Sequence, residues 1–243
     1  MRMRSGRTPT EVEEESRLNI DGYEDVRNKN LGFYDNNTES YFNLSYGAFN
    51  LESLYKRFID FDIPEGGKIL DAGCGSGRDA LNFVAKGYNV TAFDGSKGMV
   101  DMLNDNADRM LKQIAPDSYN ERKNGSFADF ECLHKDFLEI DFKNEFDAIW
   151  SAAALLHLPT EAFDKALTNL SDALKTDGTM YFSIKTLENG FLDDGTRSFY
   201  NPGQDHLKEM FDKLGLKLVD YWETGKQNDP NQTFENYILK KVD

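Results

Sequence analysis

Cysteine, histidine and long apolar runs are scarce in this sequence of 243 residues. The two cysteines, Cys74 and Cys132, cannot build the disulfide framework of a small secreted domain, so a reducing compartment is expected. No segment has the apolar length that a membrane-spanning helix needs. An acidic polar run follows the first basic residues, where a signal peptide would have an apolar segment. We therefore predict a soluble, cytoplasmic protein without membrane contact.

Basic residues are few compared with acidic ones. The sequence has 28 Lys and Arg against 43 Asp and Glu, which gives a formal net charge of −15. Because binding to a phosphate backbone needs a positive field, this balance disfavours a nucleic-acid substrate, although a local basic patch is compatible with it. The three histidines form no ligand-spaced cluster, so no metal site is predicted. Hydrophobic residues make up 39% of the chain, enough to fill a buried core.

The chain divides into three parts by pattern. Residues 1–20 are polar, charged and without periodicity, which is typical of a flexible arm. Residues 21–62 are rich in aromatic side chains, partly at helical spacing, and predict a helical cap or lid. From residue 63 to 243, short apolar segments alternate with amphipathic ones, the pattern of an α/β domain.

The alternating segments predict a doubly wound, mostly parallel seven-stranded sheet with an antiparallel C-terminal strand pair and an N-terminal helical extension. Helices are expected at residues 78–86, 99–111, 160–174 and 204–213. Strands are expected at residues 68–71, 88–93, 131–134, 146–150, 180–184, 216–223 and 234–240. The polar stretch 115–130 is expected to be an exposed connection, and 186–202 is expected to be a long polar loop that could form part of a lid.

A glycine-rich turn follows the first predicted strand and precedes a helix. Gly73, Gly75 and Gly77 allow a tight turn in which backbone approaches a ligand closely, and Cys74 lies within it as a small side chain rather than as a nucleophile. The acid Asp71 stands two residues before the first glycine. A carboxylate there repels a pyrophosphate and attracts a cationic amino group. The turn therefore favours a ligand with an ammonium group over a dinucleotide.

The second predicted strand ends in Asp94 and Gly95, next to the glycine turn. An acid at this strand end can accept both hydrogen bonds from a ribose diol. Met99 could place its thioether against an adenine ring. A helix-capping role for Asp94 and a core position for Met99 are the alternatives, and the spacing to the glycine turn favours ligand binding.

These motifs resemble the class I S-adenosylmethionine-dependent methyltransferases, and more loosely the tellurite-resistance group of small bacterial members. The resemblance rests on Asp71-x-Gly73-x-Gly75-x-Gly77 and Asp94, and it runs from about Tyr34 to the C-terminus, so that residues 63–243 would form the methyltransferase domain. It implies S-adenosylmethionine as cofactor. The residues that the resemblance adds to the cofactor site are Asp136 and Phe137, with the acid on the adenine amino group, Ser151 after the fourth strand, and Tyr34 above the cofactor.

Candidate residues for the methyl acceptor are fewer. His157 follows the fourth predicted strand and is the best candidate for a catalytic base, with a structural role as the equal alternative. Tyr41 is a candidate lid residue, with core packing as its alternative. Arg197 and Tyr200 could bind an anionic group of the substrate, although Arg197 could instead pair with Asp193 or Asp194.

The sequence leaves three functions open. The first is methyl transfer to a small molecule, and the second is methyl transfer to RNA or protein. The third is a non-catalytic module that binds S-adenosylmethionine and acts through protein contacts. The oligomeric state and the acceptor atom are not encoded in any pattern that we can read.

Overall fold

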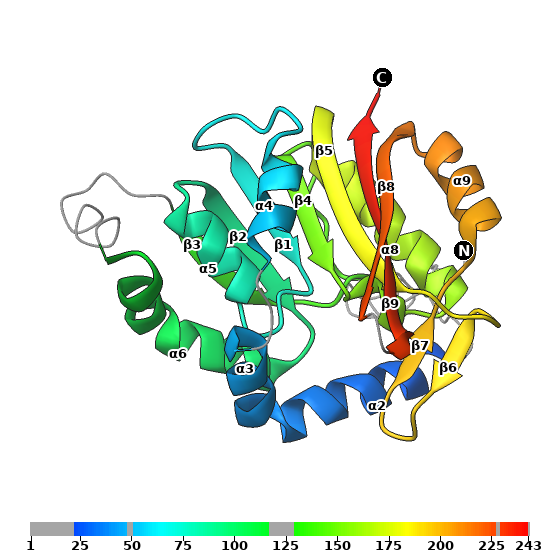
Figure 1. The fold of residues 1–243 in the computed structure, drawn as a ribbon, viewed down its shortest axis with the longest axis horizontal. Helices are drawn as coiled ribbons and strands as arrows, with labels where there is room; N and C mark the ends of the chain where they lie inside the picture. The colour runs from blue at the N-terminus through cyan, green and yellow to red at the C-terminus, as the bar shows by residue number, and fades with distance from the viewer. Residues whose placement is uncertain (1–21, 48–50, 117–128, 227–228, 243) are drawn as a thin grey trace, which may run out of the picture.

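The fold is seen in a computed structural model (Figure 1), which describes residues 22–47, 51–116, 129–226 and 229–242. The expected arm at 1–20 lies outside the described residues, as does most of the polar connection between 115 and 130. No helix in the described part of the chain is long and apolar enough to cross a membrane.

A seven-stranded sheet forms the centre of the molecule, with the strand order β3-β2-β1-β4-β5-β9-β8. Neighbouring strands are parallel from β3 to β5, whereas β9 pairs antiparallel with both β5 and β8. The predicted fold class is confirmed. The strands are β1 (Lys68–Ala72), β2 (Asn89–Asp94), β3 (Phe130–His134), β4 (Phe146–Ala152), β5 (Leu174–Lys185), β8 (Leu216–Lys226) and β9 (Asp229–Lys241).

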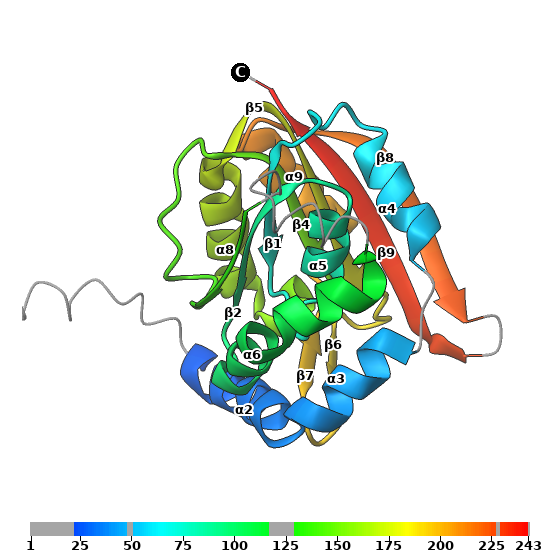
Figure 2. The same ribbon diagram turned by 90° about the vertical axis from the view of Figure 1, so that its left-hand side faces the viewer.

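Helices cover both faces of this sheet (Figure 2). One face carries α4 (Glu52–Ile59), α5 (Arg78–Ala85) and α6 (Lys97–Ile114), and the other carries α8 (Thr160–Ala173) and α9 (Gln204–Lys213). Side chains alternate between the two faces along each strand. Ile149 and Trp150, consecutive in β4, are both fully buried, but they belong to the two different cores. Both cores therefore depend on the central strands.

Two N-terminal helices, α2 (Tyr23–Asn36) and α3 (Thr38–Gly47), lie across one edge of the sheet (Figures 1 and 2). Side chains of α2 reach residues that follow β2, β3 and β4, namely Ser96, Asp136 and His157. This edge is therefore the one where the parallel strands end, and where α/β folds bind ligands.

Three local features differ from the sequence prediction. The stretch 186–202 is not only loop, because it contains a short hairpin of β6 (Phe191–Asp193) and β7 (Ser198–Tyr200). Its turn is held by the Asp194 carboxylate, which accepts hydrogen bonds from the backbone N–H groups of Thr196 and Arg197. Strand β5 begins at Leu174, six residues earlier than predicted, and a 3₁₀ turn, η1 (Leu155–His157), follows β4.

Candidate active site

The glycine turn between β1 and α5 is fixed to the neighbouring strand. The backbone N–H groups of Gly73 and Cys74 both donate to the Phe93 carbonyl of β2, each at 2.9 Å. Gly73, Gly75 and Gly77 have φ values of 75°, 51° and 77°, a region that glycine enters without steric cost. A Cβ on Gly77 would lie 2.3 Å from Leu103, whereas one on Gly75 would meet only the Tyr41 ring at 3.9 Å. Gly77 thus serves helix packing, and Gly75 leaves open space.

Asp94, at the end of β2, is hydrogen-bonded on both carboxylate oxygens. The N–H groups of Gly75 and Ser96 donate to Oδ2 and Oδ1, each at 2.8 Å. Burial raises the pKa of Asp94, and these two backbone hydrogen bonds oppose that rise. Because each carboxylate oxygen can accept two hydrogen bonds, one acceptor position per oxygen is left for a ligand.

Helix α2 is held over this edge mainly by polar contacts. Tyr23 Oη donates to Oδ1 of Asp136 at 2.8 Å, and Arg27 Nε donates to Oδ2 at 2.7 Å. Further along the helix, Asp35 accepts hydrogen bonds from Ser96 Oγ at 2.6 Å and from the Gly98 N–H at 3.0 Å. These contacts join α2 to the segments that follow β3 and β2.

His157 lies at the centre of a third set of contacts. Its Nε2 is 2.8 Å from Tyr34 Oη, and its Nδ1 is 3.1 Å from the Ser198 carbonyl oxygen. Asn30, one turn before Tyr34 on α2, donates through Nδ2 to the carbonyls of His157 and Ser198, both at 3.2 Å. Burial lowers the pKa of His157 to about 4, so the imidazole is neutral at physiological pH.

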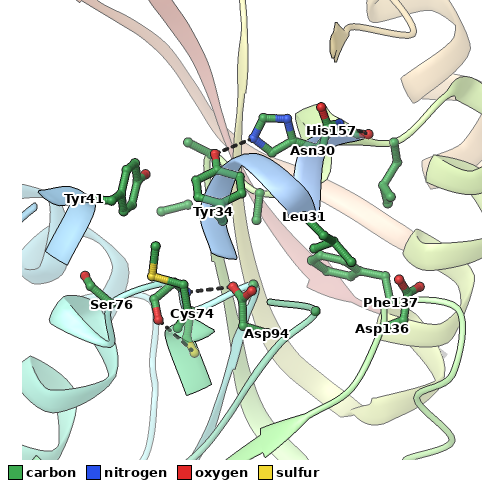
Figure 3. Close-up of a pocket in the computed structure, with 18 of the residues that line it drawn as sticks. Asn30, Leu31, Tyr34, Tyr41, Cys74, Ser76, Asp94, Asp136, Phe137 and His157 are labelled. Carbon is green, nitrogen blue, oxygen red and sulfur yellow. Dashed lines mark hydrogen bonds between the residues drawn. The ribbon is translucent and has the colours of Figure 1, made fainter. Parts of the chain in front are cut away.

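A cavity of about 980 Å³, its open mouth included, lies between the glycine turn and the two N-terminal helices. In Figure 3, Tyr34 and His157 face Cys74 and Asp94 across it. The predicted site residues that line the cavity are Tyr34, Tyr41, Gly73, Cys74, Gly75, Asp94, Gly95, Met99, Asp136, Phe137 and His157.

Four predicted site residues do not line this cavity, namely Asp71, Ser151, Arg197 and Tyr200. Asp71 is buried beneath the turn, and its Oδ2 has no hydrogen-bond partner in the described structure. Ser151 is fully buried and donates to the Ala72 carbonyl at 2.9 Å. Arg197 forms an ion pair with Asp194 at 3.3 Å, and its guanidinium lies over the Phe33 ring. Tyr200, in β7, packs against Phe191 of β6.

Cys74 and Cys132 are both free thiols, with their sulfur atoms 3.8 Å apart. The hydrogen bond with Cys132, together with burial, raises the pKa of the Cys74 thiol well above its usual range. A thiol that stays protonated is a poor nucleophile. The geometry agrees with a structural position for Cys74 in the turn.

Sequence reasoning missed several residues of the cavity wall, four of them on α2. They are Tyr23, Arg27, Asn30 and Leu31, and they share one helical face with Tyr34. Their separations of four, three, one and three residues are the spacing of such a face. A helix predicted from residue 23 onward would have placed them together with Tyr34.

The fold and the cavity together define an α/β domain that binds its ligand at the ends of parallel strands, beside a glycine turn. Residues 69–178, a little under half of the chain, match the family model described as a methyltransferase domain. That part of the chain therefore resembles a methyltransferase domain in sequence. The predicted resemblance to the class I S-adenosylmethionine-dependent methyltransferases is confirmed for the domain and the fold.

Three individual proteins resemble the chain in sequence or in fold. A probable S-adenosylmethionine-dependent methyltransferase TehB from Haemophilus influenzae is 24% identical over 69% of the chain and 52% of its own length. The 1,6-didemethyltoxoflavin-N1-methyltransferase of Burkholderia thailandensis superposes with a TM-score of 0.68 at 15% identity, covering 92% of each chain. The [4+2]-cyclase SpnF superposes with a TM-score of 0.64 at 16% identity, covering 87% of this chain and 94% of its own.

The chain matches only part of the length of the first curated relatives. The chain spans between 52% and 71% of the length of three of them. The likeness to the two solved structures is a likeness of fold, because the sequence identities are low.

Proposed function

We propose that this protein is a methyltransferase that uses S-adenosylmethionine to methylate a small molecule. The observation that carries the proposal is the cavity itself, which brings Asp94, the glycine turn and the Tyr34–His157 pair to one place. When bound, S-adenosylmethionine supplies an activated methyl group, which a nucleophile can take from the sulfonium sulfur. The protein itself must orient the acceptor, exclude water and hold or move a proton.

The residues present fit such a cofactor. Asp94 keeps two free acceptor positions, which suit a ribose diol. Buried Asp71 lies beneath the turn with its Oδ2 unpartnered, and burial and the nearby Asp79 raise the pKa of this carboxyl well above its usual range. A cationic group bound above it would favour its charged form. Gly75 adds no side chain on the cavity side. Asp136 already accepts hydrogen bonds from Tyr23, Arg27 and the Leu138 N–H, which leaves it one acceptor position for an adenine amino group.

A small acceptor is favoured by the roof over the cavity. Helices α2 and α3 supply Tyr34, Tyr41 and Ser45 to the wall opposite the glycine turn. We propose that residues 21–62 act as the lid of this site. RNA or a folded protein would have to present its acceptor group through this roof, which makes those acceptors the weaker alternative.

Calorimetry tests the cofactor. We expect saturable binding of S-adenosylmethionine and none of NAD. Asp94→Asn should weaken binding about 10- to 100-fold. The substitution replaces one acceptor oxygen with an amide donor, so that one buried hydroxyl of the cofactor's ribose is left without a hydrogen-bond partner. Asp141→Asn, the same change on a side chain that is 85% exposed, is the matched control. Equal affinity in both variants, each checked for folding by thermal unfolding, would contradict the role of Asp94.

Catalysis needs its own test, because SpnF is a [4+2]-cyclase with a similar fold. With a panel of small acceptors, the release of S-adenosylhomocysteine is measured. With RNA and protein fractions from the host cell, the incorporation of a labelled methyl group from S-adenosylmethionine is measured. Turnover with a small acceptor supports the proposal. Label incorporated only into RNA or protein would contradict it. Cofactor binding without any turnover would favour the non-catalytic alternative.

A further inference from the structure

The Tyr34–His157 contact has a direction that the geometry determines. The Ser198 carbonyl oxygen is an acceptor only, so the His157 Nδ1 at 3.1 Å must carry a proton and donate it. A neutral imidazole has one N–H, and Nε2 is therefore the acceptor of the 2.8 Å hydrogen bond from Tyr34 Oη. The chain of donors runs from Tyr34 through His157 to the Ser198 carbonyl.

Asn30 holds the far end of this chain in place. Its Nδ2 donates to the Ser198 carbonyl at 3.2 Å, and its Oδ1 accepts from the Ser198 N–H at 2.8 Å. Asn30 is only 3% exposed, and it lies four residues before Tyr34 on the same helix. One helix face thus positions both the tyrosine and the carbonyl that fixes the histidine tautomer. Asn30 is a positioning residue.

Both nitrogens of His157 are engaged, although the residue lines the cavity. An acceptor molecule would have to displace Tyr34 to reach Nε2 directly. Tyr34 also lines the cavity, and its hydroxyl can accept a proton as it donates its own. The phenol is therefore the group through which the imidazole can exchange a proton with a bound molecule.

We propose that Tyr34 is a catalytic residue that relays a proton from the methyl acceptor to Nε2 of His157. This inference rests on the proposed methyltransferase function. As the acceptor's lone pair forms the new bond to the methyl carbon, the carbon–sulfur bond breaks and S-adenosylhomocysteine leaves. The O–H or N–H proton of the acceptor passes to Tyr34 Oη. The proton of Tyr34 passes to His157 Nε2, which becomes an imidazolium and later loses the proton to water. The positive charge of the cofactor thus ends on the imidazole and no co-reactant is required.

The base strength of His157 limits which acceptors gain from the relay. Burial raises the pKa of Tyr34, so the phenol stays protonated and cannot act as the base alone. His157, with a pKa of about 4, is a weak base. Three charged groups also act on the pKa of His157. Arg197 and Lys185 lower it because they disfavour the imidazolium, and Asp194 raises it. A weak base can take a proton only from a group that methylation makes strongly acidic.

That condition selects a chemical class. A hydroxyl group, or a weakly basic ring N–H, becomes strongly acidic as it receives the methyl group, and its proton can move to His157. An aliphatic amine keeps its proton after methylation, and a thiolate has none to give. The relay therefore assigns a neutral acceptor with a hydroxyl or ring N–H as the substrate class.

Nuclear magnetic resonance of the ¹⁵N-histidine-labelled protein tests the hydrogen-bonded chain without any acceptor. The His157 signals are assigned by their loss in His157→Gln. We expect the Nδ1–H tautomer, with no titration between about pH 5.5 and 8. Tyr34→Phe should shift the Nε2 resonance toward that of a free pyridine-type nitrogen, whereas Tyr41→Phe, a phenol without a hydrogen bond to His157 in the described structure, should not. An Nε2–H tautomer, or an Nε2 signal insensitive to Tyr34→Phe, overturns the proposal.

Kinetics with defined probes tests the relay itself. Catechol and benzimidazole carry a hydroxyl and a ring N–H, and hydrosulfide is an anion whose methylation releases no proton. Tyr34→Phe should lower kcat about 100-fold for the first two and less than about threefold for hydrosulfide, at similar cofactor affinity. An equal loss with all probes would overturn the relay. If the wild-type protein methylates none of them but turns over another small acceptor, that acceptor replaces the probes. No turnover with any acceptor contradicts the proposed function, and the resonance experiment still decides whether Tyr34 is bonded to Nε2.

Discussion

Glycine residues of the same turn have different physical roles, and single substitutions should separate them. At Gly77, an added Cβ would lie 2.3 Å from Leu103 at a φ of 77°, so Gly77→Ala combines backbone strain with overpacking. We expect it to lower the free energy of unfolding by about 2–4 kcal/mol. At Gly75, the added methyl would meet only the Tyr41 ring, 3.9 Å away, so Gly75→Ala should cost about 1–2 kcal/mol.

The variants Gly75→Ala and Gly77→Ala should differ in the opposite order in their affinity for the cofactor. Gly75→Ala places a methyl group beside the cavity and should weaken S-adenosylmethionine binding more than Gly77→Ala does. Urea denaturation and calorimetry on the two variants measure both quantities. A larger loss of affinity in Gly77→Ala than in Gly75→Ala would contradict these separate roles.

His157 makes the stability of the fold depend on pH in a defined direction. Its folded pKa of about 4 lies below the usual value of 6.5, so the unfolded chain binds this proton first as the pH falls. Stability is therefore fully present above about pH 6.5 and is lost as the pH falls toward 4, by about 2–3 kcal/mol for this one group. Urea midpoints measured across this range report the loss.

Two variants separate the contribution of His157 to the pH dependence of stability from that of the carboxylates. His157→Gln should remove its share of the slope, whereas His206→Gln, at a residue ion-paired with Asp164 on α8, should retain it. A slope that is the same in His157→Gln and in the wild type would contradict a neutral His157 in the folded protein.

At the scale of elements, α2 differs from α9 in the kind of contacts that hold it against the domain. Only Tyr23 and Asn30 are buried in it, and its contacts to Asp136, Ser96 and His157 are hydrogen bonds and an ion pair. Helix α9, by contrast, buries Leu207, Met210 and Phe211 against the core. Elements with little buried apolar surface open at low free energy.

Cofactor binding should therefore stabilise α2 selectively. In hydrogen exchange with saturating S-adenosylmethionine, we expect protection of the amides of α2 to rise about tenfold or more, and that of α9 to change much less. This outcome supports residues 21–62 as a lid. A uniform rise across α2 and α9, or none in α2, would show that the helix is a fixed wall.

The strands and the fold class were predictable because their signals are local. Alternating buried segments, the glycines at 73, 75 and 77, and the acid at 94 fix the central sheet and one wall of the cavity. The partners of these residues were not predictable in the same way. The contact of Asp136 with Tyr23 spans 113 residues, and no periodicity in either segment encodes that distance. The structure was needed to show that α2 closes the site.

The hairpin β6–β7 illustrates a second limit of sequence reasoning. A run rich in Gly and Asp between 186 and 202 reads as a loop, yet its turn is built by Asp193 and Asp194 accepting backbone N–H groups. The sequence placed Arg197 as a candidate for binding an anion, with an ion pair as the alternative. The structure places it in the ion pair with Asp194, outside the cavity wall.

At the scale of the whole molecule, charge is arranged so that cations around the cavity are paired. Arg27 and Arg78 line it, and each forms an ion pair, with Asp136 at 2.7 Å and with Asp79 at 2.6 Å. On the rim side, Lys29 pairs with Asp193 at 2.6 Å. Together with the net charge of −15, this pairing leaves the region with little positive field for a polyanion.

A polyanionic acceptor should therefore bind poorly even under favourable conditions. Phosphate contacts strengthen as salt is lowered, because fewer counterions compete, so the most sensitive test is at about 50 mM salt. With a fluorescently labelled single-stranded RNA, we expect no saturation up to about 100 μM protein, the weak end of non-specific nucleic-acid binding. A positive control is the double variant Asp136→Asn with Asp193→Asn, which removes the partners of Arg27 and Lys29 and should increase any residual binding. Tight, salt-dependent RNA binding by the wild-type protein would contradict the small-molecule assignment, because a field strong enough to hold RNA could not coexist with neutralised cations at the mouth of the site.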